Sequence, residues 1–175
     1  MEYRNSLDKS GECSKNGKKA EDAFLAIVRG KTYIHDAREA TLEEQKQHID
    51  HVFKRSDGRE IRVDTKAMKK VSRNDKTFRT DLVWVEFKNI HGYPGWLYGK
   101  ADFISFEREN DFVLVDRKKL SQLCEKLVNK NNKVDSAYDA LYNSYTRAGR
   151  KDVLSQIKMD DVLNNIDYTL MIKKY

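Results

Sequence analysis

The sequence has few of the features that mark membrane, secreted or disulfide-rich proteins. Its longest unbroken apolar run, Ala23 to Val28, has six residues, far fewer than the roughly 20 that a membrane-spanning helix requires. No apolar segment follows the first charged residues, so no secretory signal is expected. The two cysteines, Cys13 and Cys124, suit a reduced protein better than a disulfide scaffold. We therefore expect a cytoplasmic protein with no membrane partner.

Several common catalytic motifs are also missing. The sequence contains no P-loop, no GxGxxG, no GxSxG and no CxxC pair, which leaves nucleotide-driven, serine-hydrolase and cysteine-zinc mechanisms without support. What the chain has in abundance is charge: 34 Lys and Arg against 28 Asp and Glu, for a net charge of +6. This excess weakly favours a polyanionic partner such as nucleic acid, because neutralised phosphates release counterions.

The 175 residues are enough for one domain of ordinary size. Residues 1–17 are polar and irregular and are expected to form a flexible N-terminal arm, so the single domain spans residues 18–175. From Lys18 to Arg29, apolar residues recur at steps of three and four, which predicts an amphipathic helix that ends near Gly30. Thr41 and Glu44 have the spacing of a capping box, which predicts a short helix over 41–47.

The rest of the pattern predicts strands and further helices. The turn signal Ser56-Asp57-Gly58 separates His48–Phe53 from an alternating segment, Glu60–Met68, and favours a hairpin. Strands are expected over 81–87, 101–106 and 112–115, helices over 118–129 and 160–164, and an edge strand over 152–157. This order predicts a mixed β-sheet flanked by helices, in the α/β or α+β class.

The most informative segment is the strand that contains Asp64 and Lys66. Alternate side chains of a strand share a face, so these two residues are expected to be neighbours. The hairpin brings Asp50 alongside the same strand, and Glu21 lies on the polar border of the first helix, which must pack on the sheet. Two carboxylates and a lysine are therefore expected to converge, with a third carboxylate near them.

These positions resemble the motif of the PD-(D/E)XK nuclease superfamily, whose fold is called restriction-endonuclease-like. The family pattern is an acidic residue on the first helix, an Asp at the start of one strand and an acid-x-Lys on the next, here Glu21, Asp50 and Asp64-Thr65-Lys66. Ile49 stands where the motif's name puts Pro. The resemblance covers residues 17–128 by order of elements and a handful of positions by identity. It implies a Mg²⁺-dependent deoxyribonuclease, and enzymes of this fold often form homodimers.

The chemistry of phosphodiester hydrolysis gives each of these residues a role. A hard divalent cation stabilises negative charge on the phosphoryl oxygens and supplies hydroxide at neutral pH. Asp50, Asp64 and the backbone carbonyl of Thr65 are expected to hold Mg²⁺, for which Mn²⁺ should substitute, with Glu21 acting directly or through a water. Lys66 would orient the attacking water or offset charge in the transition state, and a role as base would require a lowered pKa.

Two alternatives remain open at this stage. Arg62, Asp64 and Lys66 are also what the solvated face of an antiparallel strand would present. A non-catalytic nucleic-acid-binding or assembly module could keep the same fold and basic face without turnover. Dependence of cleavage on a metal separates this module from the nuclease.

A second segment, Val85 to Lys100, contains three glycines and the only proline among aromatic and basic residues. Its rings could stack on bases while its cations meet phosphates, with DNA expected more than RNA. Alternatively, the glycines and Pro94 shape a loop in which Trp96 and Tyr98 cap the core. The candidate nucleic-acid-binding residues are His48, Lys88, Asn89, Trp96, Tyr98 and Lys100.

The segment His48-Ile49-Asp50-His51 also permits a transition-metal hypothesis, because imidazole and carboxylate groups bind Zn²⁺. On a strand, however, His48 and Asp50 share a face whereas His51 points away. The other histidines, His35 and His91, are solitary, so we favour Mg²⁺ over Zn²⁺.

Overall fold

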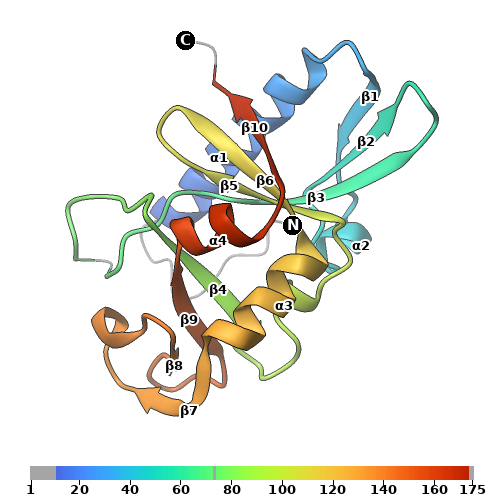
Figure 1. Cartoon of the computed structure of the whole chain (residues 1–175). Helices are drawn as coiled ribbons and strands as arrows, with labels where there is room; N and C mark the ends of the chain where they lie inside the picture. The colour runs from blue at the N-terminus through green and yellow to red at the C-terminus, as the bar shows by residue number, and fades with distance from the viewer. Residues whose placement is uncertain (1–10, 73, 174–175) are drawn as a thin grey trace.

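The computed structural model of the chain describes residues 11–72 and 74–173 and has a mixed α+β fold (Figure 1). Its α-helices are α1 (Glu12–Arg29), α2 (Leu42–Gln45), α3 (Arg117–Leu127) and α4 (Met159–Asn165), and short 3-10 helices span Trp96–Tyr98 (η1) and Ala137–Asp139 (η2). Its strands are β1 (Ile34–Glu39), β2 (His51–Arg55), β3 (Glu60–Lys66), β4 (Leu82–Lys88), β5 (Phe103–Glu107), β6 (Asp111–Asp116), β7 (Asn129–Val134), β8 (Asn143–Tyr145), β9 (Val153–Lys158) and β10 (Tyr168–Ile172).

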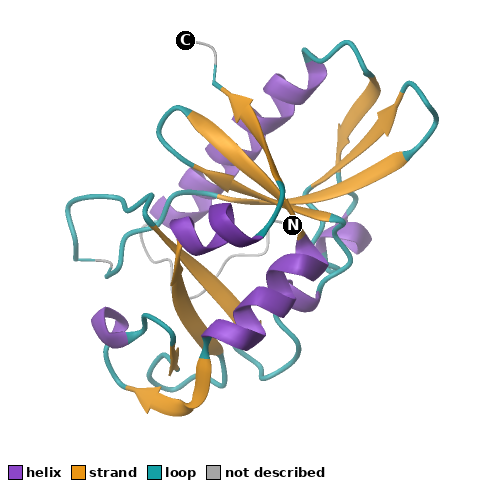
Figure 2. Cartoon of the chain, viewed as in Figure 1, coloured by secondary structure: helices purple, strands orange, loops and turns teal. Residues whose placement is uncertain are grey.

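The strands form two mixed sheets flanked by helices, which confirms the predicted class but not the prediction of a single sheet (Figure 2). The larger sheet has the order β1-β2-β3-β5-β6-β10, and the smaller has the order β4-β9-β8-β7. In the larger sheet only β3 and β5 run parallel. No helix in the described part of the chain is long and apolar enough to cross a membrane.

Helix α1 packs on one face of the larger sheet through residues one turn apart. Ala20, Phe24 and Val28 are all buried there, as the periodicity predicted. The ring of Phe24 lies 5.8 Å from that of Phe53 on β2 and 5.2 Å from that of Phe112 on β6, measured between centroids. Side chains of α1 therefore pack with side chains of several strands in one hydrophobic cluster.

The same helix begins earlier than the hydrophobic pattern indicated. Its first residue is Glu12 rather than Lys18, so residues 12–17 are helical and do not belong to a flexible arm. Residues 12–17 have no buried side chain. The spacing of apolar residues therefore could not reveal this first part of the helix. The remainder of the predicted arm, residues 1–10, lies outside the described residues.

The predicted hairpin of β2 and β3 is confirmed. The two strands pair antiparallel with His51 opposite Val63, and the turn between them contains Gly58 at a φ of 84°. The capping box of α2 is also present, since the Thr41 hydroxyl accepts from the Glu44 amide and the Glu44 carboxylate accepts from the Thr41 amide. These elements were predictable because their signals are local.

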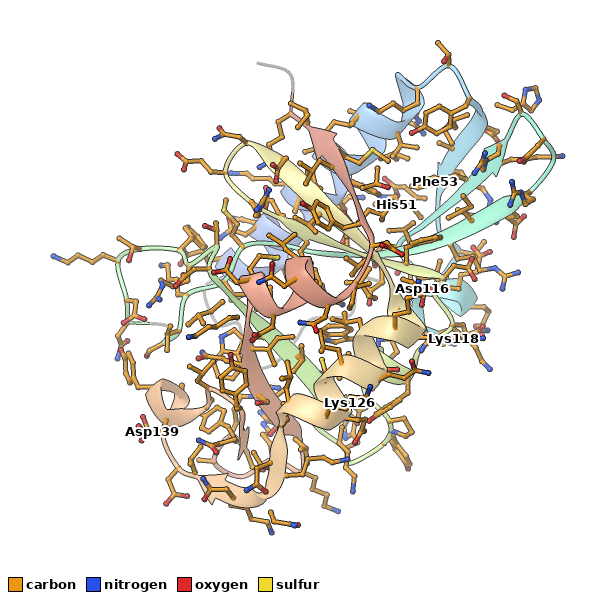
Figure 3. All side chains as sticks on the ribbon, viewed as in Figure 1. His51, Phe53, Asp116, Lys118, Lys126 and Asp139 are labelled. Atoms are coloured by element: carbon orange, nitrogen blue, oxygen red, sulfur yellow. The ribbon has the colours of Figure 1, made fainter. Side chains whose placement is uncertain are left out.

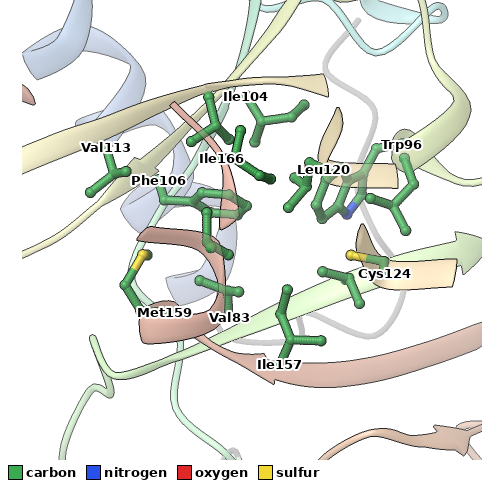
Figure 4. Close-up of a cluster of buried hydrophobic side chains, with 14 of the residues drawn as sticks. Val83, Trp96, Ile104, Phe106, Val113, Leu120, Cys124, Ile157, Met159 and Ile166 are labelled. Atoms are coloured by element: carbon green, nitrogen blue, oxygen red, sulfur yellow. The ribbon is translucent and has the colours of Figure 1, made fainter. Parts of the chain in front are cut away.

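The second face of the larger sheet and the smaller sheet share a hydrophobic cluster (Figure 4). Phe106 from β5, Leu120 from α3, Ile157 from β9 and Val162 from α4 all contribute to it and are almost completely buried. Because β4 and β9 supply one side of this cluster and β5 and β6 the other, the two sheets are held in one packed unit.

The smaller sheet corrects two predictions. Strand β9 was predicted as an edge strand, but it lies between β4 and β8. No strand was predicted beyond the helix over 118–129, yet residues 129–134 form strand β7, whose side chains are nearly all exposed. An exposed polar edge strand carries no alternation of apolar residues, so pattern analysis does not detect it.

The α1 cluster gives a direct test of the fold. Phe24→Ala should lower the free energy of unfolding by about 3–5 kcal/mol, because it removes a fully buried ring and leaves a cavity. Urea unfolding followed by circular dichroism measures this change. Tyr93→Ala is the control, since Tyr93 is 68% exposed and its loss should change stability by less than about 0.5 kcal/mol. Equal effects of the two substitutions would contradict the packing described for α1.

Candidate metal and catalytic site

Strand β3 places Asp64 and Lys66 on one face, as predicted. The Nζ atom of Lys66 lies 2.7 Å from Oδ1 of Asp64. Asp64 is only 2% exposed, and Lys66 retains 26% of its side-chain exposure. The alternative of a solvated strand face is therefore wrong for Asp64, although it holds for the exposed Arg62.

Asp50 lies one residue before β2 and joins the same site through the hairpin. Its backbone amide donates to the Val63 carbonyl at 2.9 Å, and its Oδ2 atom accepts from the Thr65 amide at 2.7 Å. These two bonds bring the Asp50 carboxyl group near that of Asp64, so that each affects the pKa of the other. Two carboxylates repel each other, so this proximity favours a proton or a cation between them.

The electrostatics of the pair reflect that requirement. Burial, followed by the charge of Asp64, raises the pKa of Asp50 to about 7. Burial also raises the pKa of Asp64, against the opposing effect of Lys66. The Oδ2 atom of Asp64 is buried and has no hydrogen-bond partner among the described residues. A buried carboxylate oxygen without a donor is costly, and it is an oxygen ligand of the kind that Mg²⁺ prefers.

Glu21 lies near this pair without joining it directly. Burial and then the charge of Asp50 raise the pKa of Glu21 to about 7, while Lys18 and Lys66 lower it. Its recorded ion pair is with Lys18, at 3.9 Å and one helical turn away. The structure thus brings Glu21 within electrostatic range of Asp50 and Lys66.

Glu86 on β4 is a component that sequence reasoning missed. It is largely buried, and burial raises its pKa, while Lys66 and the backbone amide of Trp96 lower it. Lys66 Nζ also lies 4.9 Å from the centroid of the Trp96 ring. The signal was present, because Glu86 is the only charged residue between Leu82 and Phe87, in a strand whose other residues before Lys88 are apolar or aromatic. The proximity of Glu86 to Lys66 could not be inferred from the sequence, since β4 belongs to the other sheet.

These neighbours determine the charge of Lys66. Burial disfavours its ammonium form, but the carboxylates of Asp64, Asp50 and Glu86 outweigh burial and raise its pKa. Lys66 is therefore protonated at neutral pH and cannot accept a proton from water. The surroundings of Lys66 therefore favour a role in orienting water and compensating charge over a role as a base.

The glycine and proline segment shapes the loop that carries Trp96. A Cβ atom on Gly95 would lie 2.4 Å from the Glu86 carbonyl oxygen and 2.7 Å from the Glu86 Cγ atom, so no larger residue fits. The Gly95 amide donates to the Phe87 carbonyl at 2.9 Å, which holds the loop on β4. Trp96 is 7% exposed and belongs to the core cluster, which supports the interpretation of this residue as a cap on the core rather than a surface for base stacking.

The other residues predicted to bind nucleic acid lie at separate places. Lys88 and Lys100 are exposed, whereas the Asn89 side chain accepts from the amides of His91 and Tyr93 and serves the turn. The hydroxyl of the exposed Tyr98 donates to Glu125.

His48 has a left-handed backbone and is half-buried. Burial and then the charge of Lys66 lower its pKa, while Asp50 raises it, so this imidazole is the member of the predicted set that lies within electrostatic range of the carboxylate pair.

The chemistry of the donors fits a hard cation better than zinc. Among residues 11–72 and 74–173, no group of three or more His, Cys, Asp or Glu side chains is arranged to hold a metal ion. His51 is buried between aromatic rings, 6.1 Å from Phe24 and 6.2 Å from Phe53 between centroids, and its nitrogens have no partner among these residues (Figure 3). Asp50 and Asp64 supply two carboxyl groups, fewer than such a group needs, so a hard cation would depend on bound waters or a backbone carbonyl for its remaining ligands.

A large cavity adjoins the site. Its volume is about 1030 Å³, and its lining includes Lys66, Glu86 and Trp96 together with residues of the smaller sheet and of the loop before β4. Lys66 therefore faces Asp64 on one side and open space on the other, where a substrate could reach it.

The comparisons with known proteins add no assignment. A scan against family models, a search of curated proteins and a search of solved structures each found no match. The interpretation of the site therefore depends on the geometry of its residues.

The buried pair predicts a pH-dependent gain in stability for Asp50→Asn. The unfolded carboxyl group ionises near its ordinary pKa of 3.8 whereas the folded one does so near 7, so stability from this group is greatest below pH 3.8 and is lost as the pH rises through 7. An amide cannot ionise, and its oxygen can still accept from Thr65. Thermal unfolding in EDTA should show a gain at least about 1 kcal/mol larger at pH 8 than at pH 5.

The control for this experiment is Asp36→Asn, at an exposed position on β1. It should leave the difference between the two pH values unchanged from that of the unsubstituted protein. A loss of stability at pH 8 in Asp50→Asn would show that the carboxylate form of Asp50 is well solvated or already paired, contrary to the site described.

Proposed function

We propose that the protein is a Mg²⁺-dependent nuclease that hydrolyses phosphodiester bonds of DNA, with a restriction-endonuclease-like arrangement of its site. The observation that carries this proposal is the buried Asp64 carboxylate, with Lys66 Nζ 2.7 Å from its Oδ1 atom, no partner on its Oδ2 atom among the described residues, and the half-buried Asp50 close enough for the charge of Asp64 to raise its pKa. Two carboxylates held close together away from water lower the stability of a fold, and a divalent cation between them would offset this loss.

Each residue contributes a distinct step to the proposed reaction. Asp50, Asp64 and the Thr65 carbonyl would hold Mg²⁺ or Mn²⁺, which supplies charge stabilisation and a hydroxide at neutral pH. The Lys66 ammonium group would orient the attacking water and offset the negative charge that develops on the phosphoryl oxygens. Glu21, whose pKa lies near neutrality, can exchange a proton with water at the pH of the reaction.

Glu86 would act as a positioning residue through Lys66. Its carboxylate helps to keep Lys66 protonated, and together with the Trp96 ring it limits the directions that the ammonium group can take. This arrangement gives Lys66 charged neighbours from both sheets, so the relative placement of the sheets contributes to the site.

The central prediction concerns Asp64 and Lys66. Asp64→Asn and Lys66→Ala should each lower Mg²⁺-dependent cleavage of labelled DNA by at least about 10³-fold, because one removes a metal ligand and the other removes transition-state charge stabilisation. Linear, nicked, branched and single-stranded substrates with Mg²⁺, Mn²⁺ or EDTA would be compared on denaturing gels.

Lys54→Ala is the matched control, since Lys54 is exposed on β2 of the same hairpin. It should retain activity, and circular dichroism should show that all three variants are folded. Full activity in Asp64→Asn or Lys66→Ala would refute the proposal, and DNA binding without metal-dependent cleavage would favour a non-catalytic binding module instead.

Glu86→Gln tests the positioning role separately. We expect a decrease in kcat of about 10- to 100-fold with little change in KM, and an alkaline limb of the pH–rate profile that moves to lower pH. The shift follows because the Glu86 carboxylate raises the pKa of Lys66 and its removal lowers that pKa. A profile that keeps its position while kcat falls would indicate that Glu86 serves only the packing of β4.

A further inference from the structure

We infer that the cavity beside Lys66 binds unpaired nucleotides, so that the DNA segment cleaved at this site is single-stranded when it reaches the carboxylates. This inference rests on the proposed nuclease function and adds the class of substrate. It is carried by the size of the cavity, the rings and cations in its wall, and its connection to the site.

The cavity has the dimensions of a ligand site rather than of a duplex-binding surface. Its volume of about 1030 Å³ lies just above the range of about 300–1,000 Å³ that is typical of small-molecule pockets. This space holds a few nucleotides. Proteins that read duplex DNA usually insert a projecting helix or β-ribbon into a groove, whereas this wall is concave. A strand that enters the cavity must therefore be separated from its complement.

Aromatic rings form part of the cavity lining. Phe78 is 42% exposed, and Lys70 Nζ lies 5.3 Å from the centroid of its ring. The Trp84 ring lies 5.8 Å from that of Tyr145, and its Nε1 atom donates to the Lys70 carbonyl at 3.2 Å. The Trp84 ring is thus held by two contacts, and the exposed Phe78 ring offers a face on which a base can stack.

The lining has five cations and three carboxylates. The cations are Lys66, Lys69, Lys70, Arg79 and Arg147, and the carboxylates are Glu12, Glu86 and Glu107. Four of the cations form ion pairs, Lys66 with Asp64, Lys70 with Glu12, Arg79 with Asp81 and Arg147 with Asp152, so a phosphate would share them with these carboxylates. Arg147 is held in place by the buried Asp152, whose carboxylate accepts bonds from both the backbone amide and Nε of Arg147. Alternation of cations with stacking surfaces is the usual composition of single-strand binding sites.

The cavity also leads to the reacting groups. Lys66 and Glu86 are part of its lining, and Lys66 is in direct contact with Asp64. The rings of Phe78 and Trp84 lie in the same lining. Nucleotides stacked there would present a phosphodiester to Lys66, whereas a duplex would have to remain outside.

The test measures binding and cleavage with the full chain. A fluorescein-labelled single-stranded 12-mer and the corresponding duplex would be titrated in EDTA and followed by anisotropy. We expect the single strand to bind at least about 10-fold more tightly. Phe78→Ala should weaken single-strand binding by about 5- to 100-fold, as expected for loss of one stacked base, and Lys70→Gln should weaken it and reduce its salt dependence.

The matched control is Tyr93→Ala, which removes an exposed ring that is not part of the cavity lining and should change neither affinity. Equal or tighter binding of the duplex, or unchanged single-strand affinity in Phe78→Ala, would overturn the inference. Phe78 is exposed, so its substitution should leave the fold intact, and circular dichroism would verify this.

Cleavage of the same two DNAs with Mg²⁺ separates this inference from the proposed function. Cleavage that depends on Asp64 but prefers the duplex would support the proposed nuclease function and refute the single-strand site. Phe78-dependent single-strand binding without cleavage under any metal would support the cavity as the binding site and refute the nuclease.

Discussion

The burial of Asp64 beside Asp50, with Lys66 as its counter-charge, is the constraint on which the rest of the site depends. Asp64 is 2% exposed and has one carboxylate oxygen without a partner among the described residues. A buried ion pair recovers its desolvation cost only when its hydrogen bonds are complete, and here they are not. The surrounding fold must therefore stabilise this arrangement, which it does through the α1 cluster below β3 and the cluster shared by the two sheets.

The two sheets contribute different parts of this arrangement. The larger sheet supplies Asp50, Asp64 and Lys66 from one hairpin, so their relative positions follow from strand register. The smaller sheet supplies Glu86, and the loop after β4 supplies Trp96, both of which act on Lys66. A register shift of one residue in β3 would turn Asp64 to the other face. The site is therefore more sensitive to changes in this hairpin than to changes elsewhere.

The cavity links the proposed hydrolysis to the inferred single-stranded substrate. The cavity lining combines Lys66 and Glu86 with the rings of Phe78 and Trp84 and with further cations. A strand bound along the rings would bring its phosphate to the protonated Lys66, which lies between Asp64 and the cavity. Gly95 permits the close approach of the Trp96 loop to Glu86, and Trp96 and Glu86 both belong to the cavity lining.

The sequence by itself determined the local elements: the amphipathic part of α1, the capping box at Thr41, the β2–β3 hairpin and the shared face of Asp64 and Lys66. These depend on contacts between residues close in the chain or on the two-residue period of a strand. Tertiary structure alone decided the second sheet, the interior position of β9, the burial of Trp96 and the approach of Glu86 to Lys66. Those features arise from pairing between distant segments, whose partners no local pattern specifies.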